Sequence, residues 1–332
     1  MNNHIHKILE ALKDQKILIT SHRDPDGDCL GSTVAMTLAL QQLGYEVTAV
    51  NRDMIPYRYA FLDPSGIIKT PHALSDYDHQ VAIVLDASDL LRLGYDMHAL
   101  FPHVKTIINI DHHMSNQLFG DINLIKVKAA ANCEILYDVL TLMNVVVNED
   151  IANALYVGIT TDTGSFKYEA TSSKTLRIAA SLIDHGADIN LIRTNVWENE
   201  PFNRILALSE VLDNLKISED GRLSWIKISQ GAILKHQLTN GDLESFVDYP
   251  RTITGVEVAL FIKEIEEGFL KVSIRTKSLV DATKIAGIFG GGGHKRAAGF
   301  KIKGDLLDQE AHIIEKVKQE IDREFSCMDL SM

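Results

Sequence analysis

The sequence has 332 residues, of which 45% are apolar and 23% are charged, and its formal net charge is −12. This length and composition predict a globular protein of two domains, and the absence of an apolar run of about 18 residues excludes a membrane-spanning helix. The acidic balance argues against a protein that binds duplex nucleic acid through a basic face. Three cysteines, far apart and odd in number, predict a cytoplasmic protein without a disulfide framework or a structural zinc site.

The first part of the chain alternates short apolar runs with helical patterns. Residues 1–16 have the periodicity of a polar amphipathic helix and lack the apolar core of a signal peptide. Strand patterns occur at 17–20, 46–50, 81–85 and 106–110, and helical patterns at 31–43, 132–143, 149–160 and 173–185. Strands that alternate with helices predict an α/β domain with a mostly parallel sheet over residues 1–185.

The pattern changes after residue 185. Residues 186–215 have a mixed helical pattern, which predicts a connector between two domains. Beyond it, alternating apolar positions predict strands, and a glycine cluster precedes a long amphipathic helix; these segments are 223–228, 257–264, 269–275 and 307–325. We therefore predict a second, smaller α+β domain over residues 216–332.

Aspartates and histidines gather where the predicted strands of the first domain end. The candidates are His22, Asp26 and Asp28 after the first strand, Asp86 after the third, Asp111, His112 and His113 after the fourth, and Asp162 at a helix end. Turns after strands often contain aspartate, but three such strand ends at the ligand-binding edge of a parallel sheet indicate a shared site. Carboxylates with imidazoles and no thiolates suit Mn²⁺, Mg²⁺ or Fe²⁺.

The number of candidate ligands favours two ions rather than one. A pair of ions needs a bridging carboxylate, and together the ions activate water and stabilise the charge that develops in phosphoryl transfer. Five clustered carboxylates would repel one another strongly without such cations. The sequence therefore predicts a two-metal hydrolytic site in the first domain.

A second cluster lies in the C-terminal domain. Residues 290–293 are all glycine and are followed directly by His294, and Arg275 ends a predicted strand. Consecutive glycines let backbone N–H groups converge on an anion, and an arginine offers a bidentate fork to phosphate. The alternative for the glycine run is a flexible loop, and Lys277 and Lys295 are equally consistent with solvated surface charges.

Taken together, these motifs resemble the DHH phosphoesterase family. The segment from His22 to Asp28, Asp86, Asp111-His112-His113 and Asp162-Thr163-Gly164 match the family's four N-terminal motifs in order. Residues 290–300, with the sequence GGGGHKRAAGF, match the glycine-rich signature of the DHH-associated domain. The resemblance therefore extends over both domains and essentially the whole chain.

The resemblance implies roles for individual residues. One Mn²⁺ ion would be held by His22, Asp26 and Asp86, and a second by Asp28, Asp86, His112 and Asp162, with Mg²⁺ as the alternative metal. Asp111 would orient a ligand histidine, and His113 would face the substrate phosphate as a hydrogen-bond donor or proton shuttle. For His113 alone, a buried structural histidine is the alternative. The substrate would be bound opposite the metals by Arg275, Gly291, Gly292, Gly293 and His294.

The resemblance also limits the classes of substrate that we expect. We do not expect a processive exonuclease, because no oligonucleotide-binding domain follows the second domain. We do not expect a membrane-bound cyclic-dinucleotide phosphodiesterase, because no membrane segment precedes the first motif. The second domain does not resemble that of the pyrophosphatases. The remaining branch hydrolyses short oligoribonucleotides and dinucleotides, and removes the 3′-phosphate of 3′-phosphoadenosine 5′-phosphate (pAp).

Two alternatives stay open. One is a small-metabolite phosphatase, or a phosphodiesterase for cyclic or linear dinucleotides, with little oligonucleotide activity. The other is a nucleotide-binding regulator, against which the intact ligand set argues. The net charge and the lack of an extended basic track or aromatic series predict a preference for about two to four nucleotides and no action on duplexes. A homodimer is compatible with the sequence.

Overall fold

The computed structural model describes residues 2–74, 78–94, 97, 100–239, 241–243, 245–266 and 268–329, without the side chains of Glu266, His294 and residues 327–329. The chain divides into two compact units, Met1–Asn199 and Glu200–Met332. Within the described ranges, every helix is too short or too polar to cross a membrane.

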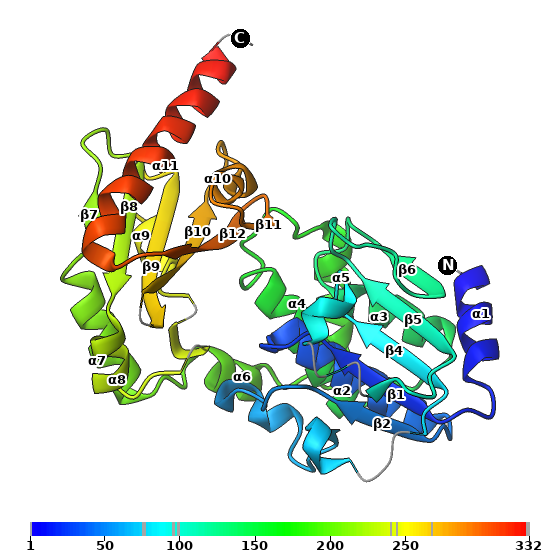
Figure 1. Cartoon of the computed structure of the whole chain (residues 1–332). Helices are drawn as coiled ribbons and strands as arrows, with labels where there is room; N and C mark the ends of the chain where they lie inside the picture. Colours follow the sequence, from blue (N-terminus) through cyan, green and yellow to red (C-terminus); the bar gives the residue numbers. More distant parts are fainter. Residues whose placement is uncertain are drawn as a thin grey trace. The chain divides into compact units, whose positions relative to one another are not determined.

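The first unit is built on a parallel sheet of six strands in the order β3-β2-β1-β4-β5-β6 (Figure 1). β1 lies at its centre, paired in parallel with β2 and β4. Both faces of β1 and β4 are buried, which explains their continuous apolar runs. The strands are β1 (Ile17–Ser21), β2 (Val47–Val50), β3 (Ile68–Lys69), β4 (Val81–Leu85), β5 (Thr106–Asp111) and β6 (Ile122–Ile125). The expected α/β class with a parallel sheet is confirmed.

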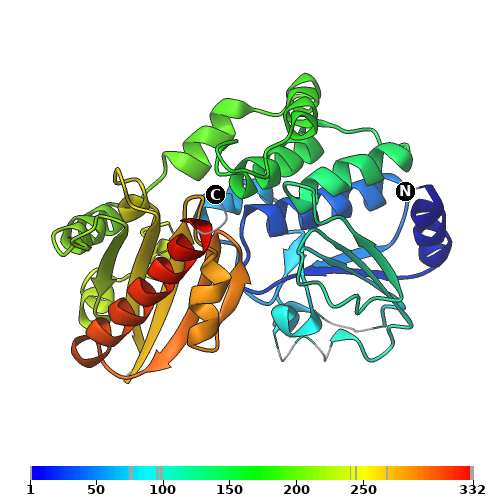
Figure 2. The same cartoon turned by 90° about the horizontal axis from the view of Figure 1, so that it is seen from above.

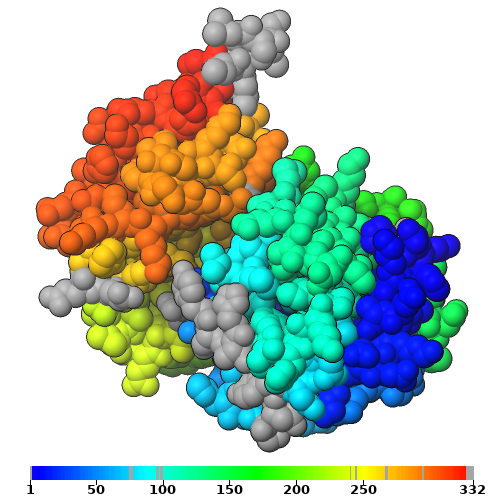
Figure 3. All heavy atoms as spheres, turned by 45° about the vertical axis from the view of Figure 1, so that its right-hand side comes forward, coloured from blue at the N-terminus to red at the C-terminus, as the bar shows by residue number. Residues whose placement is uncertain are grey.

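Helices cover this sheet and contribute most of its core. In Figure 2 the blue helix α2 and the green helices α3, α4 and α5 gather on one side of the sheet. Figure 3 shows the dark blue helix α1 against the blue-green segment that includes β6, which it contacts. The helices are α1 (Asn2–Leu12), α2 (Gly27–Gln42), α3 (Asn132–Leu142), α4 (Glu149–Asp162) and α5 (Ser173–Asp184), with the 3₁₀ turns Tyr57–Leu62, Pro71–Ala73 and Leu90–Leu93.

Helix α2 begins at Gly27, four residues before the start predicted from periodicity. Two glycines on α2 lie against α4: a Cβ atom on Gly27 would lie 2.4 Å from Thr161 Oγ1, and one on Gly31 would lie 2.3 Å from the Ala154 carbonyl oxygen. The spacing of Asp26 and Asp28 around a glycine is typical of a tight loop, but Gly27 is helical and its φ is not positive. The glycines instead let α2 and α4 pack closely.

The segment 186–215 contains three short helical elements. They are α6 (Ile189–Ile192), the π-helical turn η5 (Arg193–Trp197) and α7 (Phe202–Leu212). The division between the two compact units falls within this segment, after Asn199. The buried side of α7 belongs to a core of the second unit, where Ala207 and Val211 pack with Ile226 and Phe261.

The second unit contains a mixed sheet in the order β11-β12-β10-β9-β8-β7. Helices α10 and α11 pack on one face of it, and α7 and α8 pack on part of the other. The glycine cluster is not simply a loop, because β11 pairs with a strand, β12, that the sequence patterns did not indicate. The elements are β7 (Lys216–Ile217), β8 (Leu223–Ile228), α8 (Gln230–Lys235), the 3₁₀ turn Gly241–Leu243, α9 (Asp248–Arg251), β9 (Val258–Glu266), β10 (Phe269–Thr276), α10 (Ala282–Ile288), β11 (Gly292–His294), β12 (Ala297–Lys303) and α11 (Leu306–Asp329).

Candidate active site

The eight candidate residues of the first domain converge at the carboxyl edge of the parallel sheet. β1, β4 and β5 are adjacent, so the residues that follow them share one edge. Asp162 reaches the same place from the last residue of α4, because α4 packs on α2. The structure thus brings together, from four separate segments, His22, Asp26, Asp28, Asp86, Asp111, His112, His113 and Asp162.

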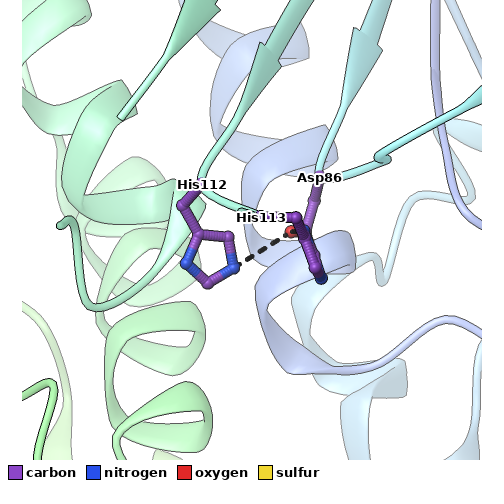
Figure 4. Close-up of side chains that lie close together, drawn as sticks. All are labelled: Asp86, His112 and His113. Atoms are coloured by element: carbon purple, nitrogen blue, oxygen red, sulfur yellow. Dashed lines mark ion pairs between the residues drawn. The ribbon is translucent and has the colours of Figure 1, made fainter. Parts of the chain in front are cut away.

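Asp86 lies between two groups of potential ligands. Its Oδ2 is 3.5 Å from His22 Nε2, which is 3.8 Å from Asp26 Oδ1. Its Oδ1 is 3.5 Å from His112 Nε2, the pair joined by the dashed line in Figure 4. Asp86 Oδ1 is buried without a hydrogen-bond donor. Oδ2 therefore faces His22, and Oδ1 faces His112 and, at 3.6 Å from Nδ1, His113. With its two oxygens on different sides, Asp86 could take part in holding two cations.

The second group is arranged around His112. Its Nε2 lies 3.3 Å from Asp162 Oδ2 and 3.9 Å from Asp28 Oδ2. The Asp28 side chain is completely buried, whereas that of Asp162 keeps 27% of its surface exposed. The group is thus closed towards the protein and open at Asp162, where water or a substrate can approach.

Two of the candidate ligand histidines, His22 and His112, are oriented by backbone carbonyl groups. His22 Nδ1 lies 2.7 Å from the Arg23 oxygen, and His112 Nδ1 lies 3.2 Å from the Ala129 oxygen. A carbonyl oxygen can only accept, so each Nδ1 must donate. In the neutral ring the lone pair is then on Nε2, which faces the carboxylates. This is the second contact that metal-binding histidines commonly make.

The electrostatics of the cluster favour cations. Burial and the neighbouring Asp86 carboxylate raise the pKa of Asp28 to about 7. Burial opposes the charge of Asp86 too, but the neighbouring His112 and His22 outweigh it and hold the pKa of Asp86 well below its ordinary value. For His112, the carboxylates of Asp86 and Asp162 outweigh burial and raise its pKa. The metal-free cluster therefore retains protons that a divalent cation would displace.

Asp28 has a further set of partners that sequence patterns did not reveal. The backbone N–H groups of Asn132 and Cys133, at the start of α3, donate to its two oxygens at 2.5 and 2.9 Å. The positive end of a helix dipole stabilises a carboxylate in this position. No side-chain motif encodes this contact, because the donors are main-chain groups more than 100 residues away.

Asp111 connects His113 to a residue that the sequence reasoning missed. His113 Nδ1 lies 2.7 Å from Asp111 Oδ1, and the Asn116 amide donates to Asp111 Oδ2 at 2.6 Å. Asn116 is itself held by the Asn109 Oδ1 atom at 2.8 Å. With Nδ1 engaged, His113 is less suited than His112 to bind a metal through that atom. The sequence signal that could have indicated Asn116 was its place as a polar residue five positions after Asp111, in the same loop.

The predicted substrate residues lie in the second unit. Arg275 is half-buried on β10, and its Nη1 donates to the Ile274 oxygen at 3.1 Å. No described carboxylate pairs with it, so most of its five N–H donors are available to an anion. Gly291 and Gly293 press against β12, where added Cβ atoms would lie 2.3 and 2.5 Å from the oxygens of Gly299 and Ala297. The His294 side chain is outside the described part of the structure.

Comparisons with known proteins decide the family. Residues 16–159 match the DHH family, N-terminal domain, and residues 227–323 match the DHHA1 domain. Over 322 residues the chain is 31% identical to the bifunctional oligoribonuclease and PAP phosphatase NrnA of Thermus thermophilus, covering 95% of this chain and 94% of the relative. The chain belongs to the DHH family. It is also 30% identical to the probable bifunctional oligoribonuclease and PAP phosphatase NrnA of Streptococcus mutans, over 85% of this chain and 88% of that one.

A solved structure shares the overall fold. An exopolyphosphatase-related protein from Bacteroides fragilis superposes with a TM-score of 0.88 at 24% identity, over 97% of this chain and 96% of that one. DHH proteins are phosphoesterases, and this chain is a hydrolase of that class. The residues that give the DHH family its name, Asp111, His112 and His113, lie where β5 meets the ligand cluster.

Proposed function

We infer that this DHH phosphoesterase hydrolyses short oligoribonucleotides and dinucleotides to mononucleotides and also removes the 3′-phosphate of pAp. The observation that carries the inference is the position of Asp86, whose two oxygens face two separate ligand groups. That geometry suits a site for phosphoryl transfer. The substrate class rests on the relatives from Thermus thermophilus and Streptococcus mutans, whose names describe oligoribonucleases and PAP phosphatases.

We assign the metal chemistry to residues 1–185 and substrate binding to residues 216–332, joined by the connector 186–215. Two divalent ions, Mn²⁺ in preference to Mg²⁺, would be held by two sets of ligands that share Asp86. The first set is His22, Asp26 and Asp86, and the second is Asp28, Asp86, His112 and Asp162. Bound there, the ions would supply Lewis acidity for phosphoryl transfer. All six residues offer nitrogen or oxygen donors, which these ions accept.

Residues of the chain itself position His113 for proton transfer to the substrate. Asp111 accepts from Nδ1 of His113, and Asn116 keeps the Asp111 carboxylate in position. Because Nδ1 donates to Asp111, any proton exchanged with the substrate would be exchanged at Nε2. His113 is therefore suited to donate a hydrogen bond from Nε2 to a substrate oxygen, or to pass a proton to the leaving oxygen.

The proposed substrate class predicts a specific order of rates. With Mn²⁺ present, kcat/KM should be highest for RNAs of about two to four nucleotides, should fall for longer strands, and should be negligible for duplexes, because a chain with net charge −12 repels long polyanions. The measurement is the cleavage of end-labelled RNAs of two to about twenty-four nucleotides, together with pAp and a cyclic dinucleotide. Rapid processive degradation of the longest strand would contradict the proposal. Turnover of pAp without any dinucleotide cleavage would favour a small-metabolite phosphatase.

Substrate binding in the second domain predicts a different effect. Arg275→Ala and His294→Ala should mainly raise KM, since loss of a charge-assisted phosphate contact costs roughly 1.5–3 kcal/mol, or about ten- to a hundredfold. Bound Mn²⁺, measured by elemental analysis, should not change. Loss of bound Mn²⁺ in either variant would mean that the substituted residue belongs to the metal site and not to the substrate site.

Gly292 offers a test of the glycine cluster that the fold tolerates. A Cβ atom on Gly292 meets nothing within 4 Å, so Gly292→Ala should leave the melting temperature unchanged. A raised KM in this variant would show that the substrate approaches the main chain there. Gly291→Ala is unsuitable, because its Cβ would lie 2.3 Å from the Gly299 oxygen.

A further inference from the structure

Lysines lie on the same sheet face as Arg275. In the continuous pairing of β10 with β12, Lys271 is opposite Lys301 and Arg275 is opposite Ala297. Side chains at every second position of a strand share a face, so Lys271 and Lys301 lie on the face of Arg275. Lys303 continues this face on β12. We call Lys271, Lys301 and Lys303 the lysine patch.

The opposite face of the same strands is fully occupied. Leu270, Val272 and Ile274 alternate with the patch positions of β10 and are buried in the core formed with α10 and α11. The three lysines of the patch are exposed. The alternation therefore places one side of β10 and β12 in the core and presents the other to solvent.

The lysine patch has no carboxylate partner in the described part of the structure. Among the residues that the structure describes, none forms an ion pair or side-chain hydrogen bond with a member of the patch. Lys263, directly opposite Lys271 on β9, is buried and its Nζ lies over the Phe261 ring. Like charges facing each other across strands destabilise a sheet. Elsewhere in this domain lysines form ion pairs with carboxylates, as Lys227 does with Glu310 at 2.5 Å.

Small residues of β10 and β12 lie between Arg275 and the patch. Ser273 lies between Lys271 and Arg275 on this face of β10, and its partner across β12 is Gly299, which has no side chain. Four residues separate Lys271 from Arg275, which corresponds to roughly 13 Å of antiparallel strand. A stacked single strand carries one phosphate about every 3.4 Å along its axis. The distance thus spans up to about four nucleotides.

We propose that Lys271 and Lys301 bind the phosphates of a short single strand that continues past Arg275, and so favour trinucleotides and tetranucleotides over dinucleotides. This inference rests on the proposed function, since it uses Arg275 as a phosphate contact. The two lysines are thirty residues apart in the sequence, so the track becomes visible only through the strand register. The sequence showed no extended basic track, because residues that are neighbours across the sheet are far apart along the chain.

The test compares a double variant, Lys271→Ala/Lys301→Ala, with the wild-type enzyme in Mn²⁺. For a tetranucleotide, kcat/KM should fall about tenfold, whereas for pAp and a dinucleotide it should stay within about twofold. Each lost lysine should reduce the slope of log KM against log[salt] by about 0.7, or roughly 1.4 for the pair. Lys271→Arg/Lys301→Arg keeps the charge and should keep the slope.

Lys318→Ala is the matched control, because Lys318 is exposed on α11, which packs on the opposite face of the sheet. It should change neither the length preference nor the salt slope. The melting temperature of the double alanine variant should be unchanged or higher, since repulsion between lysines is removed. These changes in the double variant, with none in Lys318→Ala, would support the inference.

A binding measurement separates this inference from the proposed function. The affinity of a fluorescein-labelled RNA tetramer is measured against salt in Ca²⁺, for the wild type and the double variant. An equal salt slope in both proteins overturns the lysine patch, even if the enzyme cleaves RNA. Failure of the wild type to cleave any RNA, with the slope still reduced in the variant, overturns the proposed function and leaves the binding surface supported.

Discussion

Asp86→Asn is expected to lower kcat by at least about a thousandfold, because one substitution weakens both metal positions. The two Asp86 oxygens lie 3.5 Å from His22 Nε2 and 3.5 Å from His112 Nε2, so an amide would present a poor ligand to at least one ion. The measurements are kcat with a dinucleotide and the bound Mn²⁺ content. Both should fall together.

The fold of this variant should survive. Asp86 contributes to the raised pKa of Asp28 through repulsion, so its neutral replacement relieves the metal-free cluster. In chelator, the melting temperature of Asp86→Asn should therefore equal or exceed that of the wild type, but it should no longer rise when Mn²⁺ is added. Asp184→Asn, an exposed position on α5, controls for loss of one negative charge. Full activity of Asp86→Asn would contradict the two-metal assignment.

Removal of divalent metal is expected to abolish hydrolysis, and Mn²⁺ should restore it far better than Ca²⁺. Ca²⁺ accepts larger and looser coordination shells and is a weaker Lewis acid for water. Activity is measured after dialysis against EDTA and again after addition of each ion. Because a ligand that binds only the folded state stabilises it, Mn²⁺ should also raise the melting temperature. Full activity in excess EDTA would refute the metal requirement.

The stabilisation by Mn²⁺ should grow with pH. In the metal-free protein the folded-state pKa of Asp28 is raised to about 7, so the folded state holds a proton that the unfolded state has released. Its stability therefore falls as pH rises from about 4 to 7. The raised pKa of His112 acts in the same direction above its unfolded value, since its favourable charge is lost on deprotonation. The Mn²⁺-induced rise in melting temperature, measured at pH 6 and pH 8, should be larger at pH 8.

The sequence by itself was sufficient for four of the six strands of the first sheet, all but β3 and β6, and for much of the cluster. The apolar runs 81–85 and 106–110 became β4 and β5, and the residues that follow them, Asp86 and Asp111–His113, lie at one edge. The reason is local: an apolar run long enough for a strand and too short for a helix signals a buried strand, and parallel strands align their carboxyl ends. In the second domain, alternation similarly predicted β8, β9 and β10.

Only the tertiary structure decided the contacts that join distant segments. The approach of α4 to α2 depends on Gly27, Gly31 and Gly158, where a Cβ on Gly158 would lie 2.7 Å from Asp28 Oδ1 on α2. Close packing of this kind leaves no periodic signal, so the placement of Asp162 beside Asp28 could not be read from the pattern. The same holds for the main-chain groups of α3 that bind Asp28.

The register of the strands could not be predicted from the sequence either. The pairing of Lys271 with Lys301 requires β12, a strand rich in alanine and glycine whose weak alternation did not reveal it. A shift of one residue would have sent the β12 lysines to the buried face, and the packing of Ala298, Phe300 and Ile302 into the core excludes that shift. Local patterns determined which segments are strands. The pairing that sets which charges meet came from the core that those strands share.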